Sequence, residues 1–340
     1  MEEIIVSVIM PVYNSSRFLD TAIQSILNQT FTQFELIITN DGSTDDSLSI
    51  IKNYNDNRIR LINHEINKGL IFTRNEAVAT AKGKYIALLD SDDIALPERF
   101  EKQVAFLELN PKFGLLGTWI KTIDEFGNVL KDSIQYPAKP EEIPVILLFK
   151  NYFTASSVMV LRSAVPETPF EPEFPIAEDY NVWIRIAETY KVWNLPEVLT
   201  CYRVHSNNIH IRLDKKMLEL EMLQLSKQLS KFQADFTEKE KEFFFLIGKT
   251  DYAEEYFAFL NTDIVFADKC FEKLISVNNL SGRYDKEVFF EFLKKRWSQL
   301  FVSIQKYNMT LFKNLRHSVF FRNLTQLVRI KFLIKCLIKF

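Results

Sequence analysis

The stretch Tyr85-Ile-Ala-Leu-Leu-Asp-Ser-Asp-Asp93 sets an apolar run directly against three carboxylates. Five apolar residues in a row are typical of a buried strand. The acids that follow repel one another by roughly 3 kcal/mol for a pair about 5 Å apart at an effective dielectric near 20. We therefore expect a positively charged group at this strand end.

The residues around this stretch alternate between strand-like and helix-like patterns. Apolar, β-branched runs predict four strands, at residues 4–11, 34–39, 58–63 and 85–89. Apolar residues at helical spacing predict the helices between them, at residues 18–27, 45–54 and 71–81. The alternation predicts an α/β fold with a mostly parallel sheet flanked by helices. Ligands bind beyond the carboxyl ends of the strands in such sheets, so we expect a polar site there.

The pattern changes along the rest of the chain. We predict a helix at 97–109, strands within 114–130, a strand at 158–162 and a helix at 178–190 that begins with two acids. Beyond residue 213 glycine becomes scarce, phenylalanine becomes frequent, and the periodicity is helical. The predicted organisation is a sheet domain at residues 1–212, a helical region at 213–312 and a basic amphipathic tail at 313–340.

Composition places the chain among soluble globular proteins, with 47% hydrophobic and 25% charged residues. Its cysteines, Cys201, Cys270 and Cys336, are far apart and in no metal-ligand spacing, which favours a reducing compartment. The residues after Met1 do not form a secretory leader. We expect a cytoplasmic protein.

Charge is distributed unevenly. The net charge is −2, yet no acidic residue follows Glu291 while eleven lysines and arginines do. At residues 330–340, Lys331, Lys335 and Lys339 form one stripe of a predicted helix, and Ile330, Leu333, Ile334 and Leu337 lie on another side. This favours a helix lying on an anionic membrane surface. A partner-binding or internal core helix is the alternative, and no nucleic-acid partner is expected.

Six segments in order resemble the inverting nucleotide-sugar glycosyltransferases of family 2, which have a GT-A fold. They are SVIMPVYN (7–14), NDGSTD (40–45), NKGLIFTRN (67–75), ALLDSDD (87–93), AEDYNVW (177–183) and YRVHSN (202–207). The resemblance covers roughly residues 4–210. It implies metal-dependent transfer of a sugar, with UDP as the expected carrier, to a hydroxyl of a saccharide or lipid-linked saccharide. The expected context is bacterial surface polysaccharide synthesis, in O-antigen or capsule.

The resemblance also implies which residues bind the donor. Asp41 corresponds to the acid that accepts a hydrogen bond from the uracil ring, a role suited to an ionised carboxylate. Its alternative is an Asx-turn or helix cap, and the alternative for Arg74 is a solvated surface arginine. The full set of donor-binding candidates is Pro11, Tyr13, Asp41, Asn67, Gly69, Arg74, Asp90, Ser91 and His205.

A divalent metal, Mn²⁺ or Mg²⁺, is the positive group that the resemblance implies at Asp90-Ser-Asp92. Such an ion stabilises the charge that grows on a departing diphosphate. Asp92 is the expected direct ligand, Asp90 lies nearer the ribose or reaches the metal through water, and His205 approaches the metal or diphosphate. Asp93 either joins this site or forms the polar entry to the helix near Pro97.

The catalytic base implied by the resemblance is Asp179, which would take the proton from the acceptor hydroxyl. Two acids at a helix start also occur for dipole reasons alone. Acceptor-pocket candidates lie within residues 112–173, where core packing is the alternative for each: Trp119, Tyr152, Phe153 and Ser157. A competing function is a non-catalytic nucleotide-binding partner in an assembly complex. A nucleotidyltransferase is disfavoured because residues 11–18 lack the glycines of a pyrophosphate loop.

Overall fold

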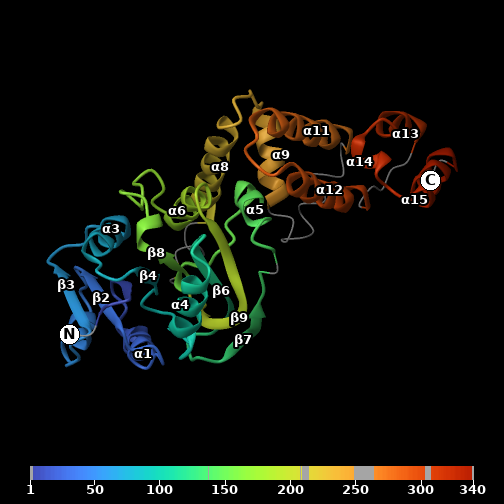
Figure 1. Cartoon of the computed structure of the whole chain (residues 1–340). Helices are drawn as coiled ribbons and strands as arrows, with labels where there is room; N and C mark the ends of the chain where they lie inside the picture. The colour runs from blue at the N-terminus through green and yellow to red at the C-terminus, as the bar shows by residue number, and fades with distance from the viewer. Residues whose placement is uncertain are drawn as a thin grey trace. The chain divides into compact units, whose positions relative to one another are not determined.

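The structure is a computed structural model that describes residues 3–136, 138–206, 208, 214–248, 264–302 and 308–338 (Figure 1). The chain folds into two compact units. Unit 1 comprises Met1–Leu147 and Asn151–Leu220, and unit 2 comprises Leu148–Lys150 and Glu221–Phe340. The predicted boundary at residue 212 lies outside the described residues and stays a prediction.

Unit 1 is built on one nine-stranded sheet with the order β3-β2-β1-β4-β8-β6-β9-β5, and β7 pairs with β6. The strands are β1 (Val6–Val12), β2 (Phe34–Asp41), β3 (Ile59–His64), β4 (Tyr85–Leu88), β5 (Ile94–Ala95), β6 (Phe113–Ile123), β7 (Val129–Ile134), β8 (Met159–Leu161) and β9 (Lys191–Arg203). The first four strands are parallel, as predicted. The second half of the sheet is mixed, because β8 runs antiparallel to both β4 and β6 whereas β6 and β9 are parallel. The α/β fold class is confirmed.

Helices flank the sheet of unit 1 (Figure 1). They are α1 (Ser16–Leu27), α2 (Ser47–Lys52), α3 (Leu70–Thr80), α4 (Arg99–Leu109) and α6 (Glu178–Ala187). The helix α5 (Ile143–Phe149) begins in unit 1 and ends in unit 2. Apolar residues of β1, β2 and β4 pack against α1 and α4 in one buried cluster. Strands buried on both faces read as continuous apolar runs, which is why the sequence identified these strands.

The remaining helices, with the exception of α8, all contain phenylalanine. They are α8 (Asp214–Ser230), α9 (Glu238–Gly248), α11 (Ile264–Ser281), α12 (Lys286–Val302), α13 (Met309–Leu315), α14 (Val319–Arg322) and α15 (Gln326–Ile338). In unit 2, Phe271, Trp297 and Phe320 are fully buried, and the Phe320 ring contacts the other two. Within the described residues, no helix is both long and apolar enough to cross a membrane.

Strand register brings the loops of the predicted site together. Val12, at the end of β1, pairs with Asn40, and Asp41, at the end of β2, pairs with His64, at the end of β3. The loops that follow these strands and β4 therefore leave the sheet at the same edge.

Gly42 makes the turn after β2 possible. Its φ is +67°, and a Cβ at this position would lie 2.5 Å from the carbonyl carbon of Ile66. Both the left-handed backbone and this close approach require glycine.

We predict that Gly42→Ala destabilises the protein by roughly 2–4 kcal/mol, because strain in the left-handed region adds to a backbone clash. Gly127→Ala is the matched control, since Gly127 has φ +89° but a Cβ there would meet no heavy atom within 4 Å. Urea unfolding of both variants measures the difference. Equal losses would show that backbone strain alone, and not the packing against Ile66, requires glycine.

Candidate active site

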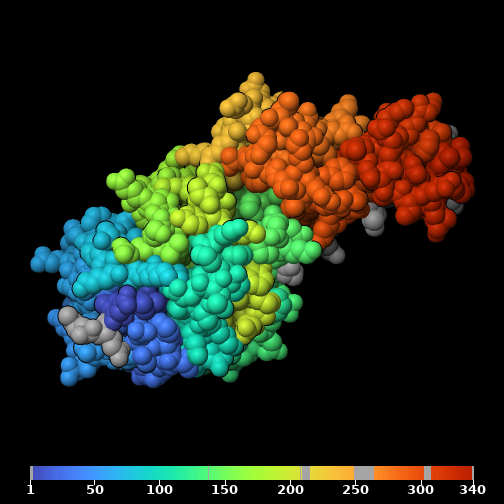
Figure 2. Space-filling view, in the orientation of Figure 1, coloured from blue at the N-terminus to red at the C-terminus, as the bar shows by residue number. Residues whose placement is uncertain are grey.

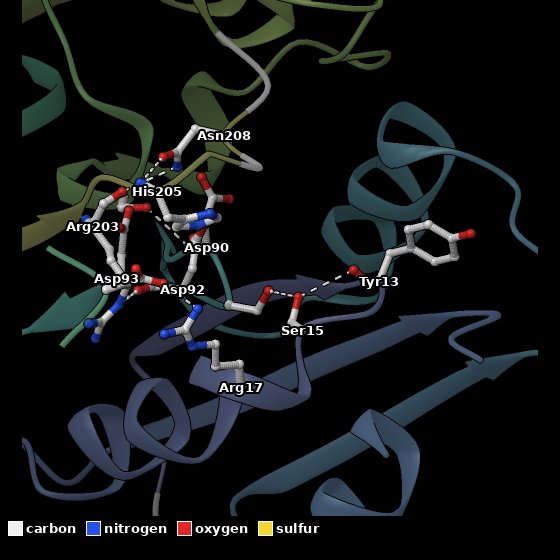
Figure 3. Close-up of polar contacts among 12 residues, drawn as sticks. Tyr13, Ser15, Arg17, Asp90, Asp92, Asp93, Arg203, His205 and Asn208 are labelled. Atoms are coloured by element: carbon white, nitrogen blue, oxygen red, sulfur yellow. Dashed lines mark hydrogen bonds and ion pairs between the residues drawn. The ribbon is translucent and has the colours of Figure 1, made fainter. Parts of the chain in front are cut away.

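The turn after β4 is tied to the loop after β1 by hydroxyl groups. The Ser91 hydroxyl donates to the Ser15 hydroxyl at 2.7 Å, and Ser15 donates to the carbonyl of Tyr13 at 3.3 Å (Figure 3). The Tyr13 ring points away from the acids in this view, and the residue is 51% exposed. Pro11, two residues before Tyr13, is partly buried. These contacts tie the backbone of Tyr13, whose ring is exposed, to the acidic turn.

Arg74 joins two acidic segments that lie far apart in the sequence. Its guanidinium donates to Asp90 at 2.6 Å and also pairs with Glu178, and its side chain is only 3% exposed. Burial lowers the pKa of Arg74, but the charges of Asp90 and Glu178 raise it by more, so the guanidinium is firmly charged. The solvated surface position considered for this arginine is therefore wrong.

Asp92 and Asp93 face the end of β9. The Asp92 carboxylate lies 2.9 Å from Nε2 of His205, and the Asp93 carboxylate accepts the Arg203 backbone N–H at 2.8 Å (Figure 3). Arg203 also donates from Nε to the Asp92 carbonyl at 2.8 Å. Asn208 closes this loop by accepting the His205 N–H at 2.6 Å.

Asp93 is fully buried, and burial together with the charges of Asp92 and Asp90 raises its pKa well above the ordinary value. It does not form the entry to the next helix, because α4 begins only at Arg99. That alternative is wrong. Its Oδ2 has no hydrogen-bond partner among the described residues.

A third arginine lies beneath the acidic turn. Arg99 is fully buried and donates to the carbonyls of Leu88 and Val158 at 3.1 and 2.9 Å. Burial lowers the pKa of its guanidinium to about 9, and the Asp93 charge opposes this only in part. The positive charge expected at the end of β4 is thus supplied in part by arginines of the chain itself.

Asp41 is buried at the end of β2 and accepts three hydrogen bonds. The donors are the backbone N–H groups of Lys68 and Gly69, at 2.8 and 2.9 Å, and Nδ1 of His64 at 2.8 Å. Burial raises the pKa of Asp41, but these hydrogen bonds outweigh it, so the pKa is lowered and the group is ionised. The carboxylate therefore holds the 67–69 segment against the end of β2, where Asn67 is exposed.

His64, for which the sequence indicates only a structural role, makes contacts that the sequence did not predict. Its second ring nitrogen lies 2.7 Å from the Glu76 carboxylate on α3, so the imidazole bridges Asp41 and Glu76. Its position in the sequence could have indicated these contacts, because His64 follows the third predicted strand just as Asp41 follows the second. A lone histidine at a strand end indicates by itself only a structural role.

Asp179 lies in the first turn of α6, beside Glu178. Asn151 donates to its carboxylate at 3.3 Å, and the Tyr180 N–H donates at 2.7 Å. Burial raises the pKa of Asp179, and it raises the pKa of Glu178 to about 7 although Arg74 opposes this. A carboxylate with a raised pKa at a partly exposed position is suited to accept a proton.

The aromatic candidates for the acceptor pocket are mostly core residues. Tyr152 and Phe153 are buried, and Ser157 is fully buried with its hydroxyl donating to Thr154. Trp119 is partly exposed. Trp183 on α6 is buried and packs against Phe153, so it is a core side chain.

The acidic turn is not a complete metal cage. Among the residues the structure describes, no group of three His, Cys, Asp or Glu side chains is arranged to hold a metal. The Asp92–His205 pair nevertheless offers one oxygen and one nitrogen donor. Asp90, two residues before Asp92, has a side chain that is 35% exposed, and its carboxylate could add a second oxygen donor. Mg²⁺ in nucleotide sites commonly takes one or two carboxylates and completes its shell with phosphate oxygens and water. This donor set fits a site completed by substrate.

Comparisons with known proteins identify the family of the chain. The sequence profile of the family described as Glycosyl transferase family 2 matches residues 7–167. The O-antigen biosynthesis glycosyltransferase WbnJ of Escherichia coli is 36% identical over 209 residues, 60% of this chain and 81% of WbnJ. The UDP-Glc:alpha-D-GlcNAc-diphosphoundecaprenol beta-1,3-glucosyltransferase WfgD of Escherichia coli is 30% identical over 211 residues, 62% of this chain and 81% of WfgD.

A solved structure confirms the fold. Staphylococcus aureus TarS 1–349 in complex with UDP matches with a TM-score of 0.52 and 20% identity, over 88% of this chain and 90% of that one. The likeness supports the predicted GT-A architecture, and the relatives in sequence are transferases. Sequence, fold and relatives agree: the chain is a glycosyltransferase enzyme of family 2.

Proposed function

We propose that the protein is a metal-dependent inverting glycosyltransferase that moves a sugar from a UDP-sugar to a saccharide hydroxyl in bacterial surface polysaccharide synthesis. The observation that carries this proposal is the bridge formed by Arg74 between Asp90 and Glu178. It joins the turn assigned to the donor diphosphate with the helix that carries Asp179. Leaving-group stabilisation and acceptor deprotonation then belong to one site.

The donor nucleotide would lie between the exposed Tyr13 ring and the 67–69 segment. We assign Asp41 to the uracil ring, because an ionised carboxylate has about four acceptor positions and three are used within the protein. Pro11, Asn67, Gly69 and Ser91 would shape the same pocket. Support for UDP as the carrier comes from the names of WfgD and of the TarS complex.

Asp92, Asp90 and His205 would hold Mn²⁺ or Mg²⁺, which when bound supplies positive charge to the diphosphate. His205 is positioned by the hydrogen bond from its backbone N–H to Asn208 and by a tilted ring contact with Phe18, with ring centroids 5.0 Å apart. Arg74 would keep Asp90 in place and lies near enough to contribute its own charge to the donor side of the site.

Asp179 would act as the general base. It takes the proton of the acceptor hydroxyl while that oxygen bonds to the anomeric carbon and the bond to the diphosphate breaks on the opposite side. One displacement of this kind inverts the anomeric configuration. Asn151 orients the carboxylate through its amide, and Glu178, paired with Arg74, keeps the helix start fixed.

We further propose that the acceptor is lipid-linked and that the enzyme works at the cytoplasmic face of the membrane. The name of WfgD specifies a diphosphoundecaprenol acceptor. Residues 313–340 of this chain carry lysines and arginines but no acidic residue, as a peripheral contact with anionic lipid requires.

We predict that Asp92→Ala lowers sugar transfer at least about 100-fold and removes the effect of Mn²⁺ on UDP binding, because a charge-stabilising ligand is lost. Released UDP and calorimetric binding with and without metal are the measurements. Asp132→Ala, at an exposed position on β7, is the control and should leave both unchanged. Full activity of Asp92→Ala would refute the metal assignment.

Asp179→Asn should keep UDP affinity within about twofold and lower turnover by roughly 10²–10⁴-fold, the usual contribution of a general base. Turnover and UDP binding are measured on the same preparation. If the protein were a non-catalytic nucleotide-binding partner, the unaltered chain would bind UDP and show no turnover for this substitution to remove. Unchanged turnover in Asp179→Asn would exclude this residue as the base.

A further inference from the structure

One side of α15 packs into unit 2. Phe332 and Cys336, four residues apart, are 4% and 1% exposed. The Phe332 ring meets Phe301 and Phe321, with centroid distances of 4.9 and 5.4 Å. These contacts fix the rotation of the helix about its own axis.

The fixed rotation turns a second apolar side of α15 outward. We call it the α15 apolar face: Leu327 (62% exposed), Ile330 (46%), Ile334 (46%), Leu337 (59%) and Ile338 (56%). At about 100° per residue, these positions fall within one sector roughly 100° wide. Lys331 and Lys335 are exposed along its edge. The helix therefore presents apolar side chains bordered by ammonium groups. By residue number, α15 belongs to the red part of the chain in Figure 2.

This concentration is unusual within the described chain. Fifteen large hydrophobic side chains are exposed, and six of them lie on the thirteen residues of α15. Single exposed apolar residues need no explanation, whereas a contiguous apolar patch marks a surface that contacts something apolar.

Charge identifies the occupant. The chain has eleven basic and no acidic residues after Glu291, so a second copy docked here would bring like charges together. An anionic lipid surface matches both the exposed apolar face of α15 and the excess of basic residues around it. Its acyl region takes the apolar side chains, and the lysine stems let the ammonium groups reach the head groups.

We infer that α15 lies flat in the surface of an anionic bilayer, with Ile330, Ile334 and Leu337 inserted among the acyl chains. The described part of α15 has thirteen residues, and no described helix is long and apolar enough to cross a membrane. The inference rests on the peripheral location proposed above and specifies the face that makes the contact. Leu333, predicted to share this side, is half-buried and lies outside the face.

The test is sedimentation of the full chain with vesicles of phosphatidylglycerol and phosphatidylcholine, compared with vesicles of phosphatidylcholine alone. We expect binding to the anionic vesicles, and a loss of affinity of about tenfold or more in Ile334→Glu, because a charge would have to enter the acyl region in place of an apolar side chain. Leu280→Glu is the matched control, since Leu280 on α11 is 86% exposed and outside the face. Lys331→Gln with Lys335→Gln should reduce the preference for anionic vesicles.

Two results would overturn the inference. One is vesicle binding in Ile334→Glu equal to that of the unaltered chain or of Leu280→Glu. The other is a dimer in solution that Ile334→Glu converts to a monomer, which would make the face a contact between copies. Transfer to a soluble saccharide, measured without vesicles, tests the enzyme separately. Its absence alongside normal vesicle binding would count against the proposed function only.

Discussion

The structure depends on neutralising acids that are held close together, two of them buried and two partly exposed. Asp90, Asp92 and Asp93 follow β4 within a few residues, and Glu178 is buried nearby. Removing one partner of a buried ion pair usually costs about 3–5 kcal/mol, because the other charge is left unpaired. Arg74 on α3 meets this requirement by pairing with Asp90 and Glu178. Arg99 on α4 and Arg203 at the end of β9 instead donate to backbone carbonyls around the turn. The same arginine contacts therefore stabilise the fold and position the acids of the site.

This arrangement explains why the site combines rigidity with room for a ligand. Arg203 and Arg99 bind backbone carbonyls and lie behind the acids, so they fix the turn without occupying the exposed carboxylate edge. Asp90 and Asp92 remain partly exposed, at 35% and 25%. A donor diphosphate and its cation can then approach a turn whose geometry is already set.

Local pattern predicted the first four strands, the helices between them and the gathering of their loops. It did not predict β9, whose run from Lys191 to Arg203 includes Pro196, or the antiparallel half of the sheet. Nor did it reveal that Arg74 and Arg99 are buried, because the same residue types are usually solvated on helices and only distant partners decide otherwise. The contacts of His64 were missed for the same reason. Its two carboxylate partners, Asp41 and Glu76, are brought to it by strand pairing and helix packing.

The bridge between Asp90 and Glu178 is tested most directly by a double-mutant cycle on unfolding free energy. Arg74→Met keeps the volume of the side-chain stem but removes its charge, and we predict a loss of about 3–5 kcal/mol. Glu178→Gln in the same chain should recover a large part of that loss, since the buried carboxylate is no longer unpaired. If Arg74→Met unfolds like the unaltered protein, or if the two substitutions simply add, the acids are not held by this arginine and the account fails.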